Sequence, residues 1–194
     1  MPTRTPYTRP SGEPALVPSF VCYADILGFS ELSRAAMKAG EGEQFLNSLR
    51  TVLNAAYERV REMAGDGTFS VKVFTDNIVV GHPVTRVVLD HGEAEFGTML
   101  WVFSELQLTL ATSGFFVRGG IAFGDHYMDD DIVFGPALLD AVALDMGGGP
   151  PRLTLARETV EQVQHHLGFY GRPGGRLTTT TFCRTPMERS FSIT

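Results

Sequence analysis

Residues 19–30 read SFVCYADILGFS, and this stretch decides how the fold begins. It starts as an apolar, strand-like run and reaches a glycine at Gly28, after which residues 31–40, ELSRAAMKAG, are compatible with a helix. Asp25 stands at the end of the apolar run. The stretch therefore predicts a strand, a tight turn and a helix, with an acidic residue where the strand ends.

Three further helices are expected between residues 43 and 151. Apolar residues recur at three- and four-residue spacing over residues 43–63 and again over residues 96–110, which is the period of one helix face. Ser113 and Gly114 end the second of these helices. The third helix follows Pro136, a residue that suits a first helical turn, and it ends in the glycine-rich stretch 147–151.

The remaining segments predict strands. Residues 69–84, FSVKVFTDNIVVGHPV, alternate and are rich in Val, Phe and Ile, so they predict a hairpin with its turn near Asp76 and Asn77. Residues 115–127 predict another strand, which an acidic turn at 129–131 joins to the apolar run 132–134. The segments 152–157 and 176–184 are strand-like, and a helix is expected between them. The expected class is α+β, with an antiparallel sheet and helices on one face.

Composition limits the class of protein. A chain of 194 residues fits one domain, and no apolar stretch reaches the roughly 20 residues that span a bilayer. We expect residues 1–18 to be a disordered, proline-rich lead-in to a catalytic domain at 19–194, in the cytoplasm. A net charge of −6 disfavours nucleic acid as a partner. The two cysteines are too far apart in sequence to suggest a zinc site, and a disulfide framework is not expected.

Asp25 has two interpretations. It is either a turn-capping residue or a metal ligand, because carboxylates serve both purposes at strand ends. The turn after it opens a helix, so backbone N–H groups at Gly28, Phe29 and Ser30 could receive phosphate oxygens with help from the helix dipole. A metal ion and a phosphate at neighbouring positions suit a single nucleotide ligand.

Asp76 also has two interpretations, since hairpin turns favour aspartate for purely conformational reasons. If the first strand lies beside this hairpin, Asp25 and Asp76 converge at one edge of the sheet. Two carboxylates there would bind Mg²⁺ or Mn²⁺, which are hard cations that prefer oxygen ligands. Such a pair points to phosphoryl-transfer chemistry.

These motifs resemble the class III nucleotidyl cyclase family. Its signature is an Asp-Ile-x-Gly-Phe-Thr/Ser turn followed by an aspartate in a later hairpin, here residues 25–30 and Asp76. A lysine four residues before the second aspartate, Lys72, and the segment RGGIAFG at 118–124 also match, and the resemblance covers about residues 19–156. The resemblance implies a ferredoxin-like α+β fold and a homodimer in which metal aspartates of one chain face base-reading residues of the other.

The resemblance also implies a role for each site residue. Asp25, Asp76 and the carbonyl of Ile26 would bind two metal ions, Mg²⁺ or Mn²⁺, and the turn at residues 28–30 would bind phosphates. Arg118 would contact phosphate, although a structural salt bridge is an equally good interpretation. The set that would read the base comprises Lys72, Asp131 and Ile132. For Lys72 the alternative is a solvated strand lysine.

The helix after Pro136 departs from the family pattern. Ordinary class III cyclases carry an asparagine and an arginine there, at positions that Leu139 and Ala143 occupy in this chain. Ile132 also stands where an adenylate cyclase would place an aspartate. This combination looks like the pyrimidine cyclases of Pycsar anti-phage defence, which would imply cyclic UMP or cyclic CMP as product and a separately encoded effector. The alternatives are an adenylate or guanylate cyclase and an inactive nucleotide-binding homologue.

Overall fold

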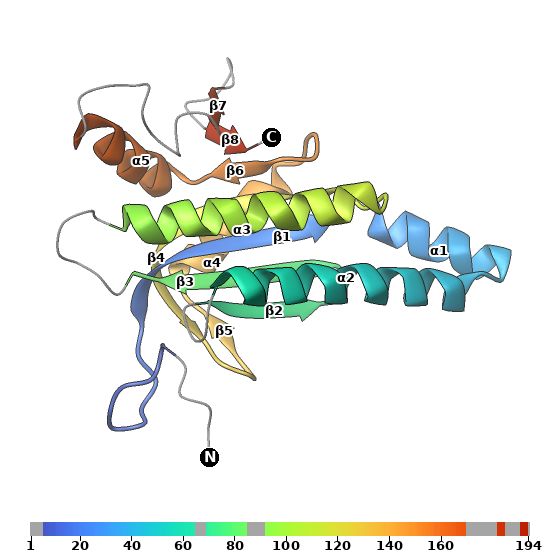
Figure 1. The fold of residues 1–194 in the computed structure, drawn as a ribbon, viewed down its shortest axis with the longest axis horizontal. Coiled ribbons are helices and arrows are strands. Elements are labelled where there is room, and N and C mark those ends of the chain that lie inside the picture. The colour runs from blue at the N-terminus through green and yellow to red at the C-terminus, as the bar shows by residue number, and fades with distance from the viewer. Residues whose placement is uncertain (1–5, 65–68, 85–91, 170–181, 185–190, 194) are drawn as a thin grey trace.

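The structure is a computed structural model that describes residues 6–64, 69–84, 92–169, 182–184 and 191–193. Figure 1 shows a central sheet with long helices packed along it. In chain order the elements are β1 (Val17–Ile26), α1 (Phe29–Ala39), α2 (Gly42–Ala64), β2 (Ser70–Phe74), β3 (Asn77–Pro83), α3 (Glu93–Thr112), β4 (Val117–Met128), β5 (Val133–Phe134), α4 (Pro136–Met146), β6 (Leu153–Leu155), α5 (Arg157–Phe169), β7 (Phe182–Arg184) and β8 (Phe191–Ile193).

The sheet has β1 near its centre. Its strand order is β2-β3-β1-β4-β6-β8-β7, and β5 pairs with β4 outside that path. Within the described part of the chain, the pair of β4 and β6 is parallel and the other strand pairs are antiparallel. The predicted α+β class is therefore confirmed, with a mixed rather than a wholly antiparallel sheet. A parallel pair needs a crossover connection, and α4 supplies it.

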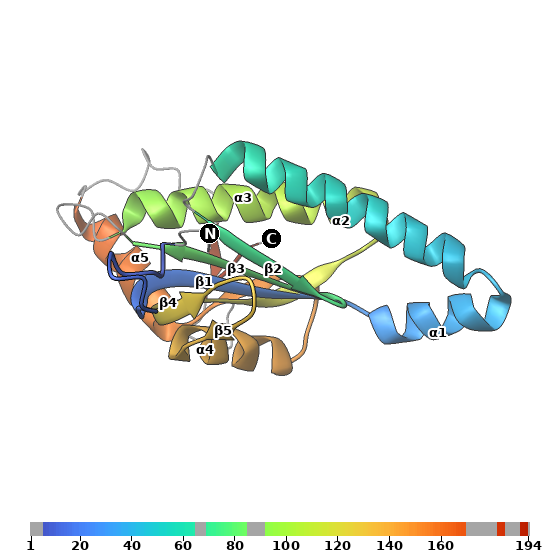
Figure 2. The ribbon, with the colours of Figure 1, turned by 90° about the horizontal axis from the view of Figure 1, so that it is seen from below.

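Helices cover both faces of the sheet, which corrects the expectation that they would lie on one face. Figure 2 shows α2 and α3 on one side of the strands and α4 on the other. Alternate residues of β1 divide accordingly: Phe20, Cys22 and Ala24 pack into the core under α2 and α3, whereas Val21 packs with alanines of α4. Successive side chains of a strand point to opposite faces of the sheet, so a strand with apolar residues at both odd and even positions is buried on both sides.

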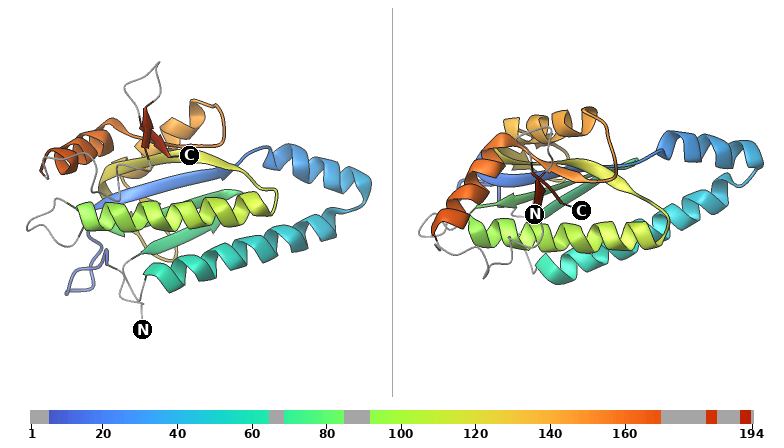
Figure 3. Two further views of the ribbon diagram at one scale, coloured as in Figure 1. Left: turned by 45° about the horizontal axis from the view of Figure 1, so that its top comes forward. Right: turned by 90° about the horizontal axis from the view of Figure 1, so that it is seen from above.

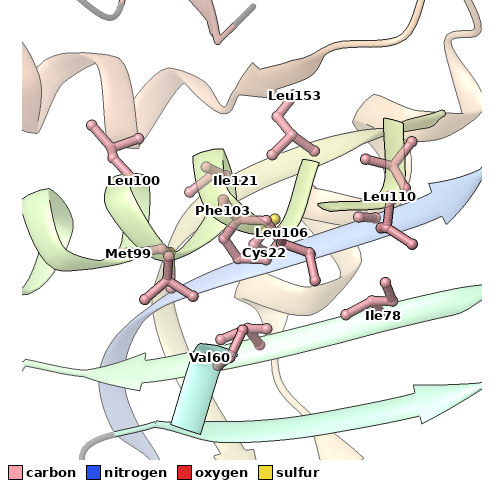
Figure 4. Close-up of a cluster of buried hydrophobic side chains, with 14 of the residues drawn as sticks. Cys22, Val60, Ile78, Met99, Leu100, Phe103, Leu106, Leu110, Ile121 and Leu153 are labelled. Carbon is pink, nitrogen blue, oxygen red and sulfur yellow. The ribbon is translucent and has the colours of Figure 1, made fainter. Parts of the chain in front are cut away.

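The main core fills the space between the sheet and α3. Figure 4 shows Cys22, Ile121 and Leu153 of the strands meeting Phe103 and Leu106 of α3. The smaller cluster on the opposite face consists largely of alanine, which lets α4 approach the strands closely. A Cβ atom at Gly120 of β4 would lie 2.5 Å from the carbonyl oxygen of Ala141 and 2.7 Å from the Cβ of Leu144. Because Gly120 has no side chain, α4 can pack this closely against β4.

Helix α1 and the first part of α2 extend beyond the end of the sheet, as Figures 2 and 3 show. No residue of α1 is fully buried. Phe29, the first residue of α1, packs against the edge of the core and contacts Phe45 of α2, with 6.1 Å between the ring centroids. The extension is therefore joined to the sheet at the turn that follows Asp25.

The N-terminal segment that the structure describes lies against the strands. Residues 6–16, expected to be disordered, form a compact loop in which the Ala15 N–H donates to the Tyr7 carbonyl, and Tyr7 is fully buried beside His126 of β4. Residues 1–5 lie outside the described part of the chain. In the described ranges, none of the helices combines the length and the apolar character needed to cross a bilayer.

Candidate functional site

Asp25 lies at the end of β1 that adjoins α1. It is directly opposite Asn77 of β3 on one side and Arg118 of β4 on the other. Residues directly opposite in antiparallel strands share a face of the sheet, so these three side chains lie on the face that α4 covers. Asp25 is therefore placed by the pairing of three strands.

Asp76 lies in the two-residue turn between β2 and β3. The backbone joins it to β1, because the Ile26 N–H donates to the Asp76 carbonyl oxygen at 3.1 Å. Thr75, the other turn residue, has a positive φ of 56° and its hydroxyl donates to Asp76 Oδ1 at 2.6 Å. The structure thus brings together the predicted set Asp25, Ile26 and Asp76, which the sequence separates by about fifty residues.

The electrostatics at Asp25 indicate crowding of negative charge. Its pKa is raised from 3.8 to about 6, first because burial removes water and then because of the carboxylates of Asp76 and Asp145, while Arg118 acts in the opposite direction. A hydrogen bond with Asp76 contributes to the same shift. The two predicted metal ligands are close enough to share a proton when no cation separates them.

This donor set fits a hard divalent cation. Two carboxylates that repel each other, at least one of them partly desolvated, gain most from a cation that accepts oxygen ligands. Among the described residues there is no cluster of three or more His, Cys, Asp or Glu side chains arranged to hold a metal ion. The fit therefore rests on Asp25 and Asp76, with backbone oxygen at Ile26 as a further donor.

The turn after Asp25 forms the predicted strand–turn–helix unit. Gly28 precedes the first residue of α1 and has a φ of 71°, a left-handed conformation that glycine adopts without steric cost. The first hydrogen bond of the helix runs from the Leu32 N–H to the Gly28 carbonyl, so the N–H groups of Phe29 and Ser30 have no partner within the helix. Phe29 and Ser30 follow Asp25 closely in sequence. An anion bound to their N–H groups would meet the positive end of the helix dipole.

Arg118 interacts with two carboxylates rather than with one. Its Nε donates to Asp145 Oδ1 at 2.9 Å, and one of its terminal nitrogens lies 4.0 Å from Asp25 Oδ2. Asp145 is in the last turn of α4, and its side chain is about 10% exposed. The structural salt bridge considered for Arg118 from sequence is present, and it reaches the predicted metal ligand.

Three residues of this region were missed from the sequence: Asp145, Tyr23 and Asn77. The Tyr23 hydroxyl donates to Asn77 Oδ1, and the pKa of Tyr23 is raised to about 12 by burial and then by the charge of Asp25. Asp145 could have been found from its spacing, because it follows Ala137 and Ala141 at intervals of four and lies on the same helix face. Tyr23 could have been found from its position two residues before Asp25 in the same strand.

The predicted base-reading residues form a second group. Lys72 is on β2, where it pairs with Val79 and lies on the α4 face, and its Nζ donates to the Asp129 carbonyl at 3.1 Å. The same turn carries Asp131 and Ile132, whose backbone N–H groups both donate to Asp129 Oδ1. Lys72 is thus half-buried and hydrogen-bonded rather than solvated. At about 3.3 Å per residue it lies roughly 10 Å along β2 from the turn that carries Asp76.

The outer surface of α4 carries Leu139 and Ala143, the two positions singled out from the sequence. Leu139 is 69% exposed and Met146 is 80% exposed, and Ala143 is on the same exposed side. These positions follow the three- and four-residue spacing of one helix face. This face of α4 is apolar and open to contact from outside the chain.

Comparison with known proteins supports the fold. No protein-family model matches the sequence, and no curated protein matches it significantly. Among solved structures, the chain is similar to the guanylyl cyclase domain of the RhoGC fusion protein from the aquatic fungus Blastocladiella emersonii, with 12% identity, a TM-score of 0.63 and coverage of 92% of this chain and 95% of that one. It is also similar to the adenylyl cyclase CyaB from P. aeruginosa, with 17% identity, a TM-score of 0.57 and coverage of 77% and 82%.

A third similar structure is a class III adenylyl cyclase-like ATP-binding protein from Pseudomonas aeruginosa, with 12% identity and a TM-score of 0.61. That likeness covers 83% of this chain and 39% of the other. The chain therefore has the fold of class III nucleotidyl cyclase catalytic domains. At sequence identities this low, the structural similarity establishes the fold alone, and any chemistry must be argued from the residues of the site.

Proposed function

We propose that this protein is a metal-dependent nucleotidyl cyclase. The observation that carries the proposal is the convergence of Asp25 and Asp76 beside the N-terminus of α1, because this places cation ligands next to phosphate-binding backbone groups. The reaction would convert a nucleoside triphosphate into a 3′,5′-cyclic monophosphate and pyrophosphate. It would take place in the cytoplasm, where nucleoside triphosphates are available.

Each group at the site would have a distinct role. The carboxylates of Asp25 and Asp76 and the carbonyl of Ile26 would hold two ions of Mg²⁺ or Mn²⁺. Those ions would supply charge neutralisation of the triphosphate and acidification of the ribose 3′-hydroxyl. The N–H groups at residues 28–30 would orient the β- and γ-phosphates, and Arg118 would add positive charge near the phosphates.

The reaction needs no protein nucleophile. The 3′-oxygen forms a bond to the α-phosphorus, the bond from that phosphorus to the bridging oxygen of pyrophosphate breaks, and the hydroxyl proton is lost to solvent. The rate enhancement would come from positioning and charge stabilisation. Fixed strand pairing around Asp25 suits this role, because it holds the ligands in place before the substrate arrives.

The substrate we propose is a pyrimidine nucleoside triphosphate, with UTP favoured over CTP. Lys72 lies beside the turn that holds Asp131 and Ile132, and its ammonium could donate to a pyrimidine carbonyl. Ile132 presents no acid for adenine recognition, and Leu139 and Ala143 replace the polar residues of ordinary cyclases. The cyclic UMP or cyclic CMP product would act as a second messenger in anti-phage defence, through a separately encoded effector.

The active unit would be a homodimer with shared sites. Lys72 and Asp25 are on the same face of the sheet, and Lys72 is separated along β2 from the turn that carries Asp76. The exposed apolar side of α4 is available to a second copy. A partner chain would then bring its Lys72 group to the metal site of the first. A pyrimidine held between the two chains would contact both groups.

The proposal is tested by incubating the protein with each of the four nucleoside triphosphates and Mn²⁺, then separating the products by chromatography. Cyclic UMP or cyclic CMP is expected, and Asp76→Ala should abolish it. Formation of cyclic AMP or cyclic GMP alone would overturn the pyrimidine assignment while retaining the cyclase. An unchanged rate in Asp76→Ala would overturn the metal assignment.

A second function has specific support. The apolar residues at Leu139 and Ala143 lack the functional groups that orient ribose and stabilise the transferring phosphate in ordinary cyclases, and one similar structure is described as an ATP-binding protein. The chain would then bind nucleotide without turnover. Calorimetry showing metal-dependent binding of a nucleoside triphosphate, together with no cyclic product, would favour this function.

A further inference from the structure

The cluster around Asp25 contains a carboxylate that the proposed chemistry does not use. Asp145 is in the last turn of α4, and its side chain is more buried than that of Asp25. It accepts a hydrogen bond from Arg118 at 2.9 Å. The charge of Asp145 adds to the negative charge around the metal ligands, and it is one of the causes that raise the pKa of Asp25. Its presence therefore calls for an explanation.

Arg118 has a choice between two acidic partners. It is directly opposite Asp25 in the β1–β4 pairing, so a direct ion pair with Asp25 is open to it without any change of backbone. Its Nε donates to Asp145 at 2.9 Å, whereas its contact with Asp25 is a longer ion pair, with 4.0 Å between a terminal nitrogen and Oδ2. The geometry favours the helix carboxylate over the strand carboxylate.

The close docking of α4 maintains this preference. The backbone of α4 approaches β4 at Gly120, two residues from Arg118, where a side chain larger than hydrogen does not fit. Ala137 and Ala141 bury the same helix face that carries Asp145. The carboxylate is thus held by packing rather than by a flexible loop, and it can compete with Asp25 for the guanidinium.

We propose that Asp145 is a positioning residue: by holding the Arg118 guanidinium at 2.9 Å, it keeps the contact of Arg118 with Asp25 to a long ion pair of 4.0 Å and so leaves the Asp25–Asp76 pair free to take up a divalent cation. The inference rests on the proposed function, since it concerns the same metal site. Without the charge of Asp145, the guanidinium turns to Asp25, and a fixed cation then competes with Mn²⁺ for the same oxygen atoms.

A double-mutant cycle on Mn²⁺ binding tests this inference. Binding of Mn²⁺ alone, without nucleotide, is measured by electron paramagnetic resonance of the free ion in wild type, Asp145→Asn, Arg118→Gln and the double variant. We expect Asp145→Asn to weaken Mn²⁺ binding on the order of tenfold, and Arg118→Gln to restore the affinity in the Asp145→Asn background. Asp145→Glu, which keeps the charge, should retain most of the affinity.

The outcomes separate the alternatives. If Asp145→Asn weakens binding equally with and without Arg118, Asp145 acts directly on the ion and the positioning role is wrong. If Asp145→Asn leaves Asp25-dependent binding unchanged, the inference also fails, but the proposed metal site stands. If wild type and Asp25→Asn bind Mn²⁺ alike, the metal site of the proposed function is itself wrong.

Two controls keep the result interpretable. Asp140→Asn removes the same charge from an exposed position on the same helix, and it should leave Mn²⁺ binding unchanged. Circular dichroism melting of each variant without metal shows whether it folds. If Asp145→Asn does not fold, the comparison of Asp145→Glu with wild type carries the test: affinity held within about twofold supports the proposal, and a loss as large as that expected for charge removal opposes it.

Discussion

Asp25 and Arg118 lie directly opposite each other on β1 and β4, yet Arg118 donates its hydrogen bond to Asp145 of α4. The ordinary expectation for opposite charges at a cross-strand position is a direct pair. Here the guanidinium bridges two carboxylates at unequal distances, 2.9 Å and 4.0 Å. The metal ligand is thus only partly neutralised by the chain's own cation, which leaves it suited to an external one.

The first prediction concerns the carboxylate pair. Asp25→Asn and Asp76→Asn should each reduce cyclase turnover by at least about 100-fold, because each removes a charged oxygen ligand of the proposed cations. Both should also abolish the rise in melting temperature that Mn²⁺ gives to wild type. Steady-state product assays and thermal melts with and without Mn²⁺ measure the two effects. Full activity in either variant would contradict the site.

The second prediction concerns pH. The pKa of Asp25 lies near 6 in the folded chain and near 3.8 in an unfolded one, so folding favours the protonated form. The corresponding stability is fully present below about pH 3.8 and is lost as the pH rises through about 6. Without metal, Asp25→Asn should therefore become more stable relative to wild type between pH 4 and pH 7.

Urea unfolding in the presence of a chelator, at several pH values over this range, measures that difference in the free energy of unfolding. The matched control is Asp140→Asn, which removes the same charge from an exposed position of α4. A constant difference for Asp25→Asn would show that Asp25 is not held in a charge-crowded environment.

The third prediction concerns the docking of α4. Gly120→Ala places a Cβ 2.5 Å from the Ala141 carbonyl oxygen, which forces α4 away from β4 and should destabilise the fold by about 1–3 kcal/mol. Because Asp145 moves with α4, Mn²⁺ affinity should fall as well. Gly124→Ala is the control on the same strand, since its Cβ would meet Ala137 Cβ at an ordinary 3.6 Å. Equal stability of the two variants by urea unfolding would refute the packing argument.

The fourth prediction concerns Lys72. Lys72→Gln should lower turnover of the preferred nucleotide by about tenfold or more, because it removes a charged donor from the base, and it should leave binding of Mn²⁺ alone unchanged. Lys38→Gln, at an exposed position of α1, is the charge-matched control. Product assays with each nucleotide, alongside Mn²⁺ titrations, make the comparison. A parallel loss of Mn²⁺ binding would mean that Lys72 supports the fold of the hairpin instead.

The fifth prediction concerns the shared site. If one chain supplies Asp76 and the other Lys72, mixing inactive Asp76→Ala with Lys72→Gln after subunit exchange should restore about a quarter of wild-type activity, because half of the dimers are mixed and each has one intact site. Either variant mixed with itself gives the baseline. Activity that stays at this baseline after demonstrated exchange would place both residues in one chain's site.

The local parts of this fold were predictable from sequence, and the parts set by long-range packing were not. The strand–turn–helix unit at Asp25 and the hairpin at Asp76 follow from patterns within a few residues of each, and the structure confirms both. The parallel pairing of β4 with β6 and the place of α4 on the opposite face depend on how a crossover packs. Nothing in the residue pattern of α4 alone decides which face it covers.

The same reasoning explains what was missed at the candidate site. Arg118 and Asp145 are 27 residues apart, and their contact exists because α4 crosses β4 at Gly120. The spacing of Asp145 from Ala141 shows that it shares the buried face, but its partner could not be read from spacing. The loop at residues 6–16 was also missed, because its burial depends on Tyr7 packing against His126.

The β2–β3 hairpin carries Lys72 on β2 and Asp76 in its turn, and the pairing of β2 with β3 fixes which face of the sheet Lys72 takes. A strand reverses its faces with every residue, so inserting one residue between Lys72 and Phe74 would turn Lys72 toward α2 while the turn at Asp76 stayed in place. Deletions and insertions in this edge strand are therefore far more damaging than substitutions. Over evolution, the length of this hairpin should vary less than the identity of its side chains.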